Sequence, residues 1–255
     1  MRHTCLMAAL LVSAFPAFAD EIYCPGTYDG HLQGIAVDAE GHIYWSFTVA
    51  LVKTDGEGTL LEEITVPTHH GDLWVDGDRV YVAANHPASN REPGKRTSWI
   101  YAYKTDDLSV VWKKEVPEVI PGAGGLAMRK GHFFLASGRL LKDHDQNYVY
   151  EYDADCTFIE RHVLKSGHTY LGIQTMAYVD GTWWFGCYGR PPETIRAREN
   201  LYFEEKFNYD CSLGIAPLPD GGFCVGRGER NSERKNTGWL ITVDRPAPRE
   251  NKATE

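Results

Sequence analysis

The sequence lacks the features that several classes of protein require. No stretch beyond the first nineteen residues approaches ~20 consecutive apolar residues, so no membrane-spanning helix is expected. Neither a nucleophile elbow, a phosphate-binding loop nor a dinucleotide fingerprint is present. No two cysteines have the CxxC spacing of a structural zinc knuckle. Basic residues are fewer than acidic ones, 26 against 35, and the resulting net charge of −9 argues against a nucleic-acid binder.

The composition is that of a globular protein with many short elements. Hydrophobic residues make up 43% of the 255 positions and aromatic residues 12%, enough for a large core. The 25 glycines and 13 prolines indicate many turns. Disordered, coiled-coil and collagen-like chains are excluded, because each needs a very different composition.

The first nineteen residues have the pattern of a secretory signal peptide. An apolar run from Leu6 to Phe15 is followed by Ala17-Phe18-Ala19, a small-x-small cleavage pattern. We therefore expect export to the periplasm or secretion, with one domain over residues 20–245 and a flexible tail over residues 246–255. The mature chain would keep an odd number of cysteines, which leaves at least one thiol unpaired or bound to something else. They are Cys24, Cys156, Cys187, Cys211 and Cys224.

A repeat runs through the whole mature chain. In each copy an apolar strand is followed by a turn with glycine and then by a second strand rich in aromatic and β-branched residues. The equivalent apolar positions are spaced by 38, 53, 50 and 39 residues. They are Ile35, Leu73, Leu126, Met176 and Ile215.

Each repeat predicts about four strands, which is typical of one blade of a β-propeller. Five copies over residues 31–244 predict an all-β, five-bladed propeller. The last copy offers only three strands, so we expect residues 21–27 to supply its outer strand and close the ring. A β-sandwich or barrel is the alternative, but neither would require the repeat.

The residues that open the first repeat resemble those of propellers of the NHL and SMP-30/gluconolactonase-like type. The matching segment is residues 34–44, Gly-Ile-Ala-Val-Asp-x-x-Gly-x-Ile-Tyr. The chain also looks like an uncharacterised family of secreted bacterial propellers with segments such as those at 69–72, 166–169 and 183–189. The resemblance implies the fold only. Lactonases of the SMP-30 group hold calcium with a Glu, Asn and Asp set, and because no blade of this chain begins with Glu, that activity is not carried over.

Propeller topology gathers the starts of the innermost strands at one funnel, where several polar residues are expected. The candidate metal ligands are His31, His69, His70, His168, Asp72 and Cys211, not all at once, and they would suit Zn, Cu or Fe. His31, His69 and His168 are equally candidates for metal-free acid–base catalysis. A purely structural role is the third possibility. Neighbouring residues of a strand face opposite ways, so His69 and His70 are not expected to point inward together.

The long loops predicted at this face carry an uneven charge. Residues 85–98, 138–147, 189–200 and 226–238 sum to +5, which leaves −15 on the rest of the mature chain. A basic rim over a His-lined funnel indicates an anionic ligand, such as a uronate, a sulfated sugar or a phosphate ester. The alternative is that exposed loops are simply polar. Asn85 and Gln174 are the candidates for orienting the ligand, and Arg190 and Arg227 for neutralising it.

Two hypotheses for function follow. The first is an exported lyase or hydrolase that acts on an anionic, carbohydrate-like small molecule, and the second is a non-catalytic propeller that binds a glycan or a protein. The paired carboxylates of a glycosidase are lacking, since Asp72 is the only obvious acid of the funnel. A monomer is expected. Cys187 and Cys224 would pair or stay as buried thiols, and Cys24 would pair with Cys156 only if the geometry allowed it.

Overall fold

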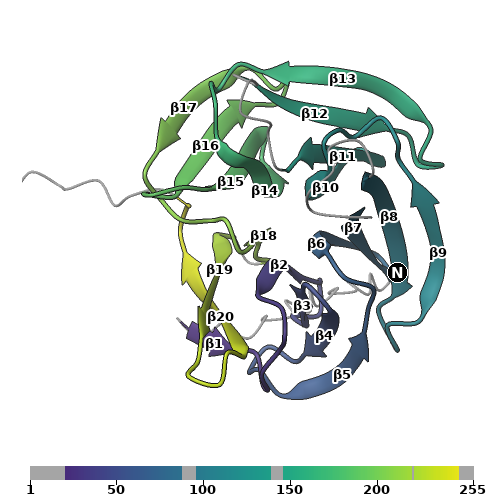
Figure 1. The fold of residues 1–255 in the computed structure, drawn as a ribbon, viewed down its shortest axis with the longest axis vertical. Coiled ribbons are helices and arrows are strands. Elements are labelled where there is room, and N and C mark those ends of the chain that lie inside the picture. Colours follow the sequence, from purple (N-terminus) through teal and green to yellow (C-terminus); the bar gives the residue numbers. More distant parts are fainter. Residues whose placement is uncertain (1–20, 88–95, 139–145, 220, 247–255) are drawn as a thin grey trace, which may run out of the picture.

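A computed structural model describes residues 21–87, 96–138, 146–219 and 221–246. In these ranges the regular elements are all strands, and they form five four-stranded antiparallel sheets around a central axis (Figure 1). The predicted five-bladed β-propeller is therefore confirmed. No helix in the described ranges is long and apolar enough to cross a membrane. The predicted signal peptide and nearly all of the predicted tail lie outside the described residues.

Each of the first four blades is built from four consecutive strands, which follow one another from the axis outward. Blade 1 contains β2 (Leu32–Val37), β3 (Ile43–Phe47), β4 (Ala50–Thr54) and β5 (Leu60–Thr65). Blade 2 contains β6 (His70–Asp76), β7 (Arg79–Pro87), β8 (Arg96–Lys104) and β9 (Val110–Glu115). Blade 3 contains β10 (Ala123–Arg129), β11 (His132–Ser137), β12 (Asn147–Tyr152) and β13 (Phe158–Leu164). Blade 4 contains β14 (Tyr170–Val179), β15 (Thr182–Tyr188), β16 (Glu193–Arg198) and β17 (Phe203–Phe207).

Blade 5 joins the two ends of the chain. Its inner strands are β18 (Ile215–Pro217), β19 (Phe223–Arg230) and β20 (Asn236–Val243), and its outer strand is β1 (Glu21–Tyr23). The register pairs Glu21 with Ile241 and Tyr23 with Trp239. The predicted closure of the ring by the N-terminal strand is thus confirmed, with a strand that ends at Tyr23.

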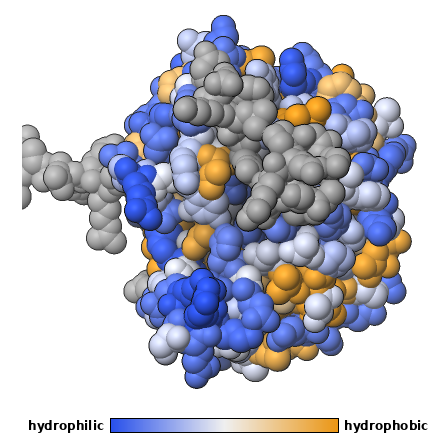
Figure 2. All heavy atoms as spheres, viewed as in Figure 1, coloured by the Kyte–Doolittle hydropathy of each residue, from blue (hydrophilic) through white to orange (hydrophobic). Residues whose placement is uncertain are grey.

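The position of a strand in its blade decides how far its side chains are buried. Every residue of β3 is buried, because a second strand is covered on both faces by the neighbouring blades, and its sequence Ile-Tyr-Trp-Ser-Phe is correspondingly apolar. The outer strand β5 is almost entirely exposed. Apolar residues still reach solvent on outer strands, among them Leu60, Leu61 and Val110. Figure 2 shows hydrophobic patches on a mostly hydrophilic surface, one toward the lower right, where Figure 1 places β4 and β5.

All five cysteines of the predicted mature chain are buried, and none of them forms a disulfide bond in the described ranges. The alternatives in which Cys187 pairs with Cys224, or Cys24 with Cys156, are therefore wrong. These cysteines occupy apolar positions of the core instead: Cys24 and Cys224 pack in one apolar cluster, and Cys187 packs in another.

Candidate functional site

A pocket of about 390 Å³ opens at the centre of the ring. Its walls come from the starts of inner strands and the ends of second strands, as propeller topology requires. The lining residues are Gln33, His69, His70, Gly71, Asn85, Ala123, Gly124, Gly138, Leu171 and Gln174. Four of the predicted site residues, His69, His70, Asn85 and Gln174, are thus brought together around one cavity.

His69 and His70 are both among the residues that line this pocket. Their rings have different surroundings, because the buried ring of His70 meets Tyr103 on β8. His69 lies just before β6 with a φ of 62°, in the left-handed region, so it does not follow the alternation of the strand. That the two rings do not point inward together stays a prediction. His69 Nδ1 lies 3.0 Å from the hydroxyl of Thr68.

His70 is buried and uses both of its ring nitrogens. Nδ1 lies 2.8 Å from the carbonyl oxygen of Pro67, and because a carbonyl only accepts, Nδ1 carries the proton. The hydroxyl of Tyr103 then donates to Nε2 at 2.6 Å. Burial lowers the pKa of His70 to about 4, since desolvation disfavours the charged ring. His70 is therefore a neutral wall of the pocket with no nitrogen left for a metal ion.

His31 pairs with Tyr188 across the ring. Their side chains meet at 2.9 Å between Nε2 and the hydroxyl, although His31 precedes β2 in blade 1 and Tyr188 ends β15 in blade 4. The atoms around His31 lower its pKa by desolvation, and the nearby His69 lowers it further. Burial also raises the pKa of Tyr188. Near neutral pH the pair is an uncharged imidazole and a protonated phenol.

The sequence reasoning missed Tyr188. The signal was available, because this tyrosine directly precedes residues 189–200, a loop predicted at the funnel face. Only an interaction between blades that are not neighbours in the ring identifies its partner, and no spacing in the sequence encodes that contact.

Asp72 lies fully buried on β6 beside the axis. Its Oδ2 accepts backbone hydrogen bonds from the N–H of Leu126 at 3.0 Å and of Met176 at 2.8 Å, so it ties blade 2 to blades 3 and 4. Oδ1 has no hydrogen-bond partner and faces Gly34 of blade 1, where a Cβ would come within 2.8 Å of it. Desolvation raises the pKa of Asp72 well above its usual range. This carboxyl group joins blades and does not line the pocket.

The other predicted residues do not line the pocket. Cys211 is a fully buried thiol whose pKa burial raises to about 12, and its carbonyl accepts a bond from Thr175 Oγ1 at 2.5 Å. His168 is exposed, and its carbonyl oxygen lies 3.4 Å from Lys206 Nζ.

The two predicted arginines differ in their surroundings. Arg227 donates from Nη1 to the carbonyl oxygens of Asp210 and Gly226, at 2.8 and 2.9 Å, which holds it against the protein. Arg190 is exposed, two positions after Tyr188. Much of the charge assigned to the loops at 85–98 and 138–147 falls on residues 88–95 and 139–145, outside the described residues.

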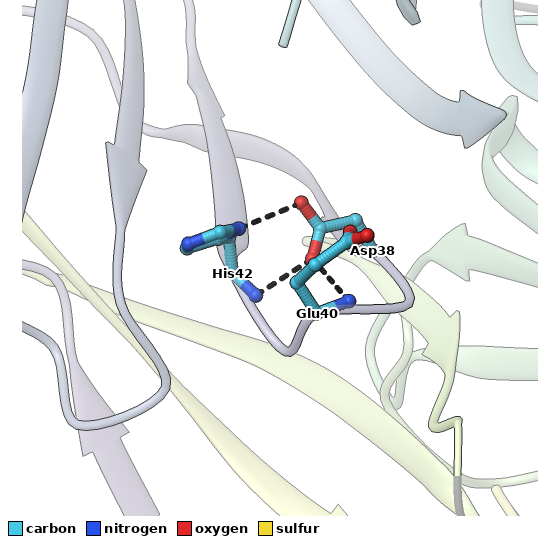
Figure 3. A group of neighbouring side chains, drawn as sticks. All are labelled: Asp38, Glu40 and His42. Carbon is cyan, nitrogen blue, oxygen red and sulfur yellow. Dashed lines mark hydrogen bonds and ion pairs between the residues drawn. The ribbon is translucent and has the colours of Figure 1, made fainter. Parts of the chain in front are cut away.

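A different group of residues has the spacing of a metal site. Asp38, Glu40 and His42, at the turn after β2, place one ligand atom each within 4.8 Å of one another and could together hold a metal ion (Figure 3). Asp38 is already engaged, however. Oδ1 accepts from the N–H of Glu40 and of His42, and Oδ2 lies 3.0 Å from His42 Nδ1 and accepts from Tyr44. Across the described ranges, no three of the six predicted ligands approach one another as closely as this group.

Comparisons with known proteins show the fold. No protein-family model matches the chain, and no curated protein matches it by sequence. Among solved structures, hydrazine synthase from Kuenenia stuttgartiensis superposes with a TM-score of 0.50 at 13% identity, over 75% of this chain and 60% of that one. A gluconolactonase from Xanthomonas campestris superposes with a TM-score of 0.49 at 12% identity, over 83% of this chain and 72% of that one. A protein of unknown function from Bacteroides caccae superposes with a TM-score of 0.48 at 15% identity, over 76% of this chain and 69% of that one. Some similar structures are thus enzymes, and at these identities the likeness concerns the propeller alone.

Proposed function

We propose that the protein is an exported enzyme, a lyase or hydrolase, that acts on an anionic, carbohydrate-like small molecule in the central pocket. The observation that supports this most is the hydrogen bond between His31 and Tyr188. It joins a histidine and a tyrosine from opposite parts of the ring beside His69, a lining residue of the cavity. A hydrogen-bonded His–Tyr pair next to a residue that lines a polar pocket is suited to proton transfer.

The protonation states define what the pair does. In the tautomer of neutral His31 that carries its proton on Nδ1, the tyrosine hydroxyl donates to Nε2, so the phenol oxygen gains basic character when its own proton moves to the ring. In a β-elimination, Tyr188 takes the proton next to the carboxylate of a uronate while its proton passes to His31. The C–O bond to the leaving group then breaks, a C=C bond forms, and the pair returns one proton to the leaving oxygen. The electrons balance without a further reactant, and a hydrolase would use the same pair to activate water.

The remaining residues bind the ligand. Asn85 and Gln174 line the pocket and offer amide groups. The exposed Arg190, two positions after Tyr188, would be the cation for a carboxylate. Arg227 is held by two carbonyl oxygens and supports the segment around Asp210. A transition-metal version with Zn, Cu or Fe cannot use His70, whose nitrogens are both engaged, and the structure does not bring His31, His69 and His168 together as one ligand set. Metal analysis of the purified protein tests that version.

The test uses oligogalacturonate and its neutral counterpart, with ultraviolet absorbance to detect an unsaturated product. We expect turnover of the uronide alone, and a loss of about 10²–10⁴ in kcat in Tyr188→Phe with nearly unchanged binding. Tyr170→Phe is the matched control, since Tyr170 pairs with Tyr188 across β14 and β15 but is 61% exposed. Uronide binding without any turnover would support the non-catalytic, glycan-binding alternative.

A further inference from the structure

Two glutamines on opposite sides of the ring face the same pocket. Gln33 lies on β2 of blade 1 and Gln174 on β14 of blade 4, and both are partly buried lining residues. These blades are not neighbours, so the two side chains approach the pocket from different walls (Figure 1). Which end of each amide the ligand meets depends on what the other end already binds.

The amide of Gln174 has one possible orientation. Its Nε2 donates to the carbonyl oxygen of Leu171 at 2.6 Å and to that of Gly172 at 3.4 Å. Carbonyl oxygens only accept, so the NH₂ group must be the end that lies there. The end left for the pocket is therefore Oε1, a hydrogen-bond acceptor.

A similar argument orients Gln33 through Thr48. The hydroxyl of Thr48 donates its single proton to the carbonyl oxygen of His31 at 3.3 Å. It must then accept from its other neighbour, Gln33, whose Nε2 lies 3.2 Å away. Gln33 thus also keeps Oε1 for the pocket.

The surroundings of these two oxygens select the kind of donor. His70, another lining residue, offers a ligand neither a donor nor an acceptor from its ring, because Pro67 and Tyr103 occupy its nitrogens. No carboxylate is among the lining residues in the described part of the chain. An ammonium group would be placed there without a counter-charge, whereas a hydroxyl group needs only the hydrogen bonds.

We propose that Gln33 Oε1 and Gln174 Oε1 are the receptors for two hydroxyl groups of a polyol or sugar ring. This rests on the proposed function, since it concerns the same pocket, and it adds the orientation of the ligand. The side of the ligand that carries the two hydroxyl groups lies against the two glutamines. The acidic end of the ligand points away from them, toward Tyr188 and Arg190. Gln33 and Gln174 are therefore specificity-determining residues that distinguish a free hydroxyl from a blocked one.

Calorimetric binding tests this with galacturonate, glucuronate, galactose and inositol, each beside analogues in which single hydroxyl groups are O-methylated. We expect the unmodified chain to bind at least one polyol about tenfold more tightly than an analogue methylated at a bonded hydroxyl. Gln33→Met or Gln174→Met should weaken binding of the parent compound and remove the preference for it over the methylated analogue. Gln146→Met, at the one other glutamine of the sequence, should keep that preference.

Three outcomes would overturn the inference: no polyol of the panel binds, the unmodified chain does not distinguish parent from analogue, or the Met variants keep the preference. The first two need no variant, so a variant that fails to fold does not leave the inference open. Absence of an unsaturated product, by contrast, contradicts the proposed lyase activity and leaves the hydroxyl preference to be measured by binding.

Discussion

Asp72 accepts a hydrogen bond at 2.8 Å from the backbone N–H of Met176, 104 positions further along the chain. The same oxygen accepts from Leu126, so one buried carboxyl group joins the inner strands of three blades. Glycine or threonine stands at the equivalent place in the other repeats: Gly34, Gly125, Thr175 and Gly214. A single polar side chain thus links backbone groups that propeller geometry otherwise leaves facing the axis.

The first prediction concerns the pH dependence of stability. Burial raises the pKa of Asp72 above its value in the unfolded chain, so the folded state holds the proton more tightly. Its contribution to stability is complete below the unfolded pKa of about 3.9 and falls as pH rises toward the folded pKa, by up to about 1.4 kcal/mol per pH unit. Urea unfolding across this pH range should show the free energy of unfolding of the unmodified chain falling with that slope relative to the free energy of unfolding of Asp72→Asn.

Asp72→Ala provides the comparison for this first prediction. It leaves the N–H groups of Leu126 and Met176 buried without an acceptor, at about 1–3 kcal/mol each. We therefore expect a large loss of stability at every pH. Parallel curves for Asp72→Asn and the unmodified chain would show that Asp72 does not change protonation on unfolding.

The second prediction concerns His31. Desolvation and the neighbouring His69 both lower its pKa, so its ring should titrate below the ordinary value of 6.5. His69→Asn removes the repulsion between two rings that can carry positive charge, and the pKa of His31 should rise. It should stay below 6.5, because desolvation is the larger cause. NMR titration of ring protons measures this, with His132→Asn on blade 3 as the control that leaves His31 unmoved.

The third prediction concerns the closing strand. Ile22 is 3% exposed, so Ile22→Ala should lower the free energy of unfolding by about 2–5 kcal/mol. Its neighbour Tyr23 is 58% exposed and stacks on Trp239 with 5.8 Å between the ring centroids. Tyr23→Ala should therefore lower the free energy of unfolding by at most about 1.5 kcal/mol. Equal losses in urea unfolding would mean that β1 does not close the ring through a buried face.

The fourth prediction concerns the thiols. Burial raises the pKa of Cys156 to about 11 and that of Cys24 to about 12, which keeps both protonated and unreactive at neutral pH. Alkylation of the chain without residues 1–19 should therefore be slow in the folded state. In denaturant without reductant, mass spectrometry should find all five cysteines modified. A product that lacks two of the five alkyl groups would reveal a disulfide bond and contradict the structure.

The architecture was predictable because each repeat carries its own pattern. The apolar residues Ile35, Leu73 and Leu126 recur before a glycine turn, and that local pattern gives strands, blades and their number. Pocket residues such as Asn85 and Gln174 followed from topology alone. The backbone at His69 did not, because its φ of 62° lies in the left-handed region outside the strand pattern.

The contacts between blades were beyond the sequence. Asp72 was expected at the funnel as a metal ligand, and its acceptance of two backbone N–H groups depends on the width of the finished ring. Tyr188 and His31 are 157 positions apart, and their meeting requires that four blades be in place. The orientation of the Gln33 amide depends in turn on the single proton of Thr48.

The pairing of β1 with β20 has a consequence for the order in which the protein is made. The first described strand to leave the ribosome has to wait for the last one, since its partner begins at Asn236. Blades 1 to 4 each consist of consecutive strands, which can pair as they emerge, whereas blade 5 remains incomplete until β20 has been made. Until then Ile22 lacks the part of its apolar cluster that blade 5 supplies, which includes Cys224 and Leu240. An open ring is the form that chaperones or proteases would meet.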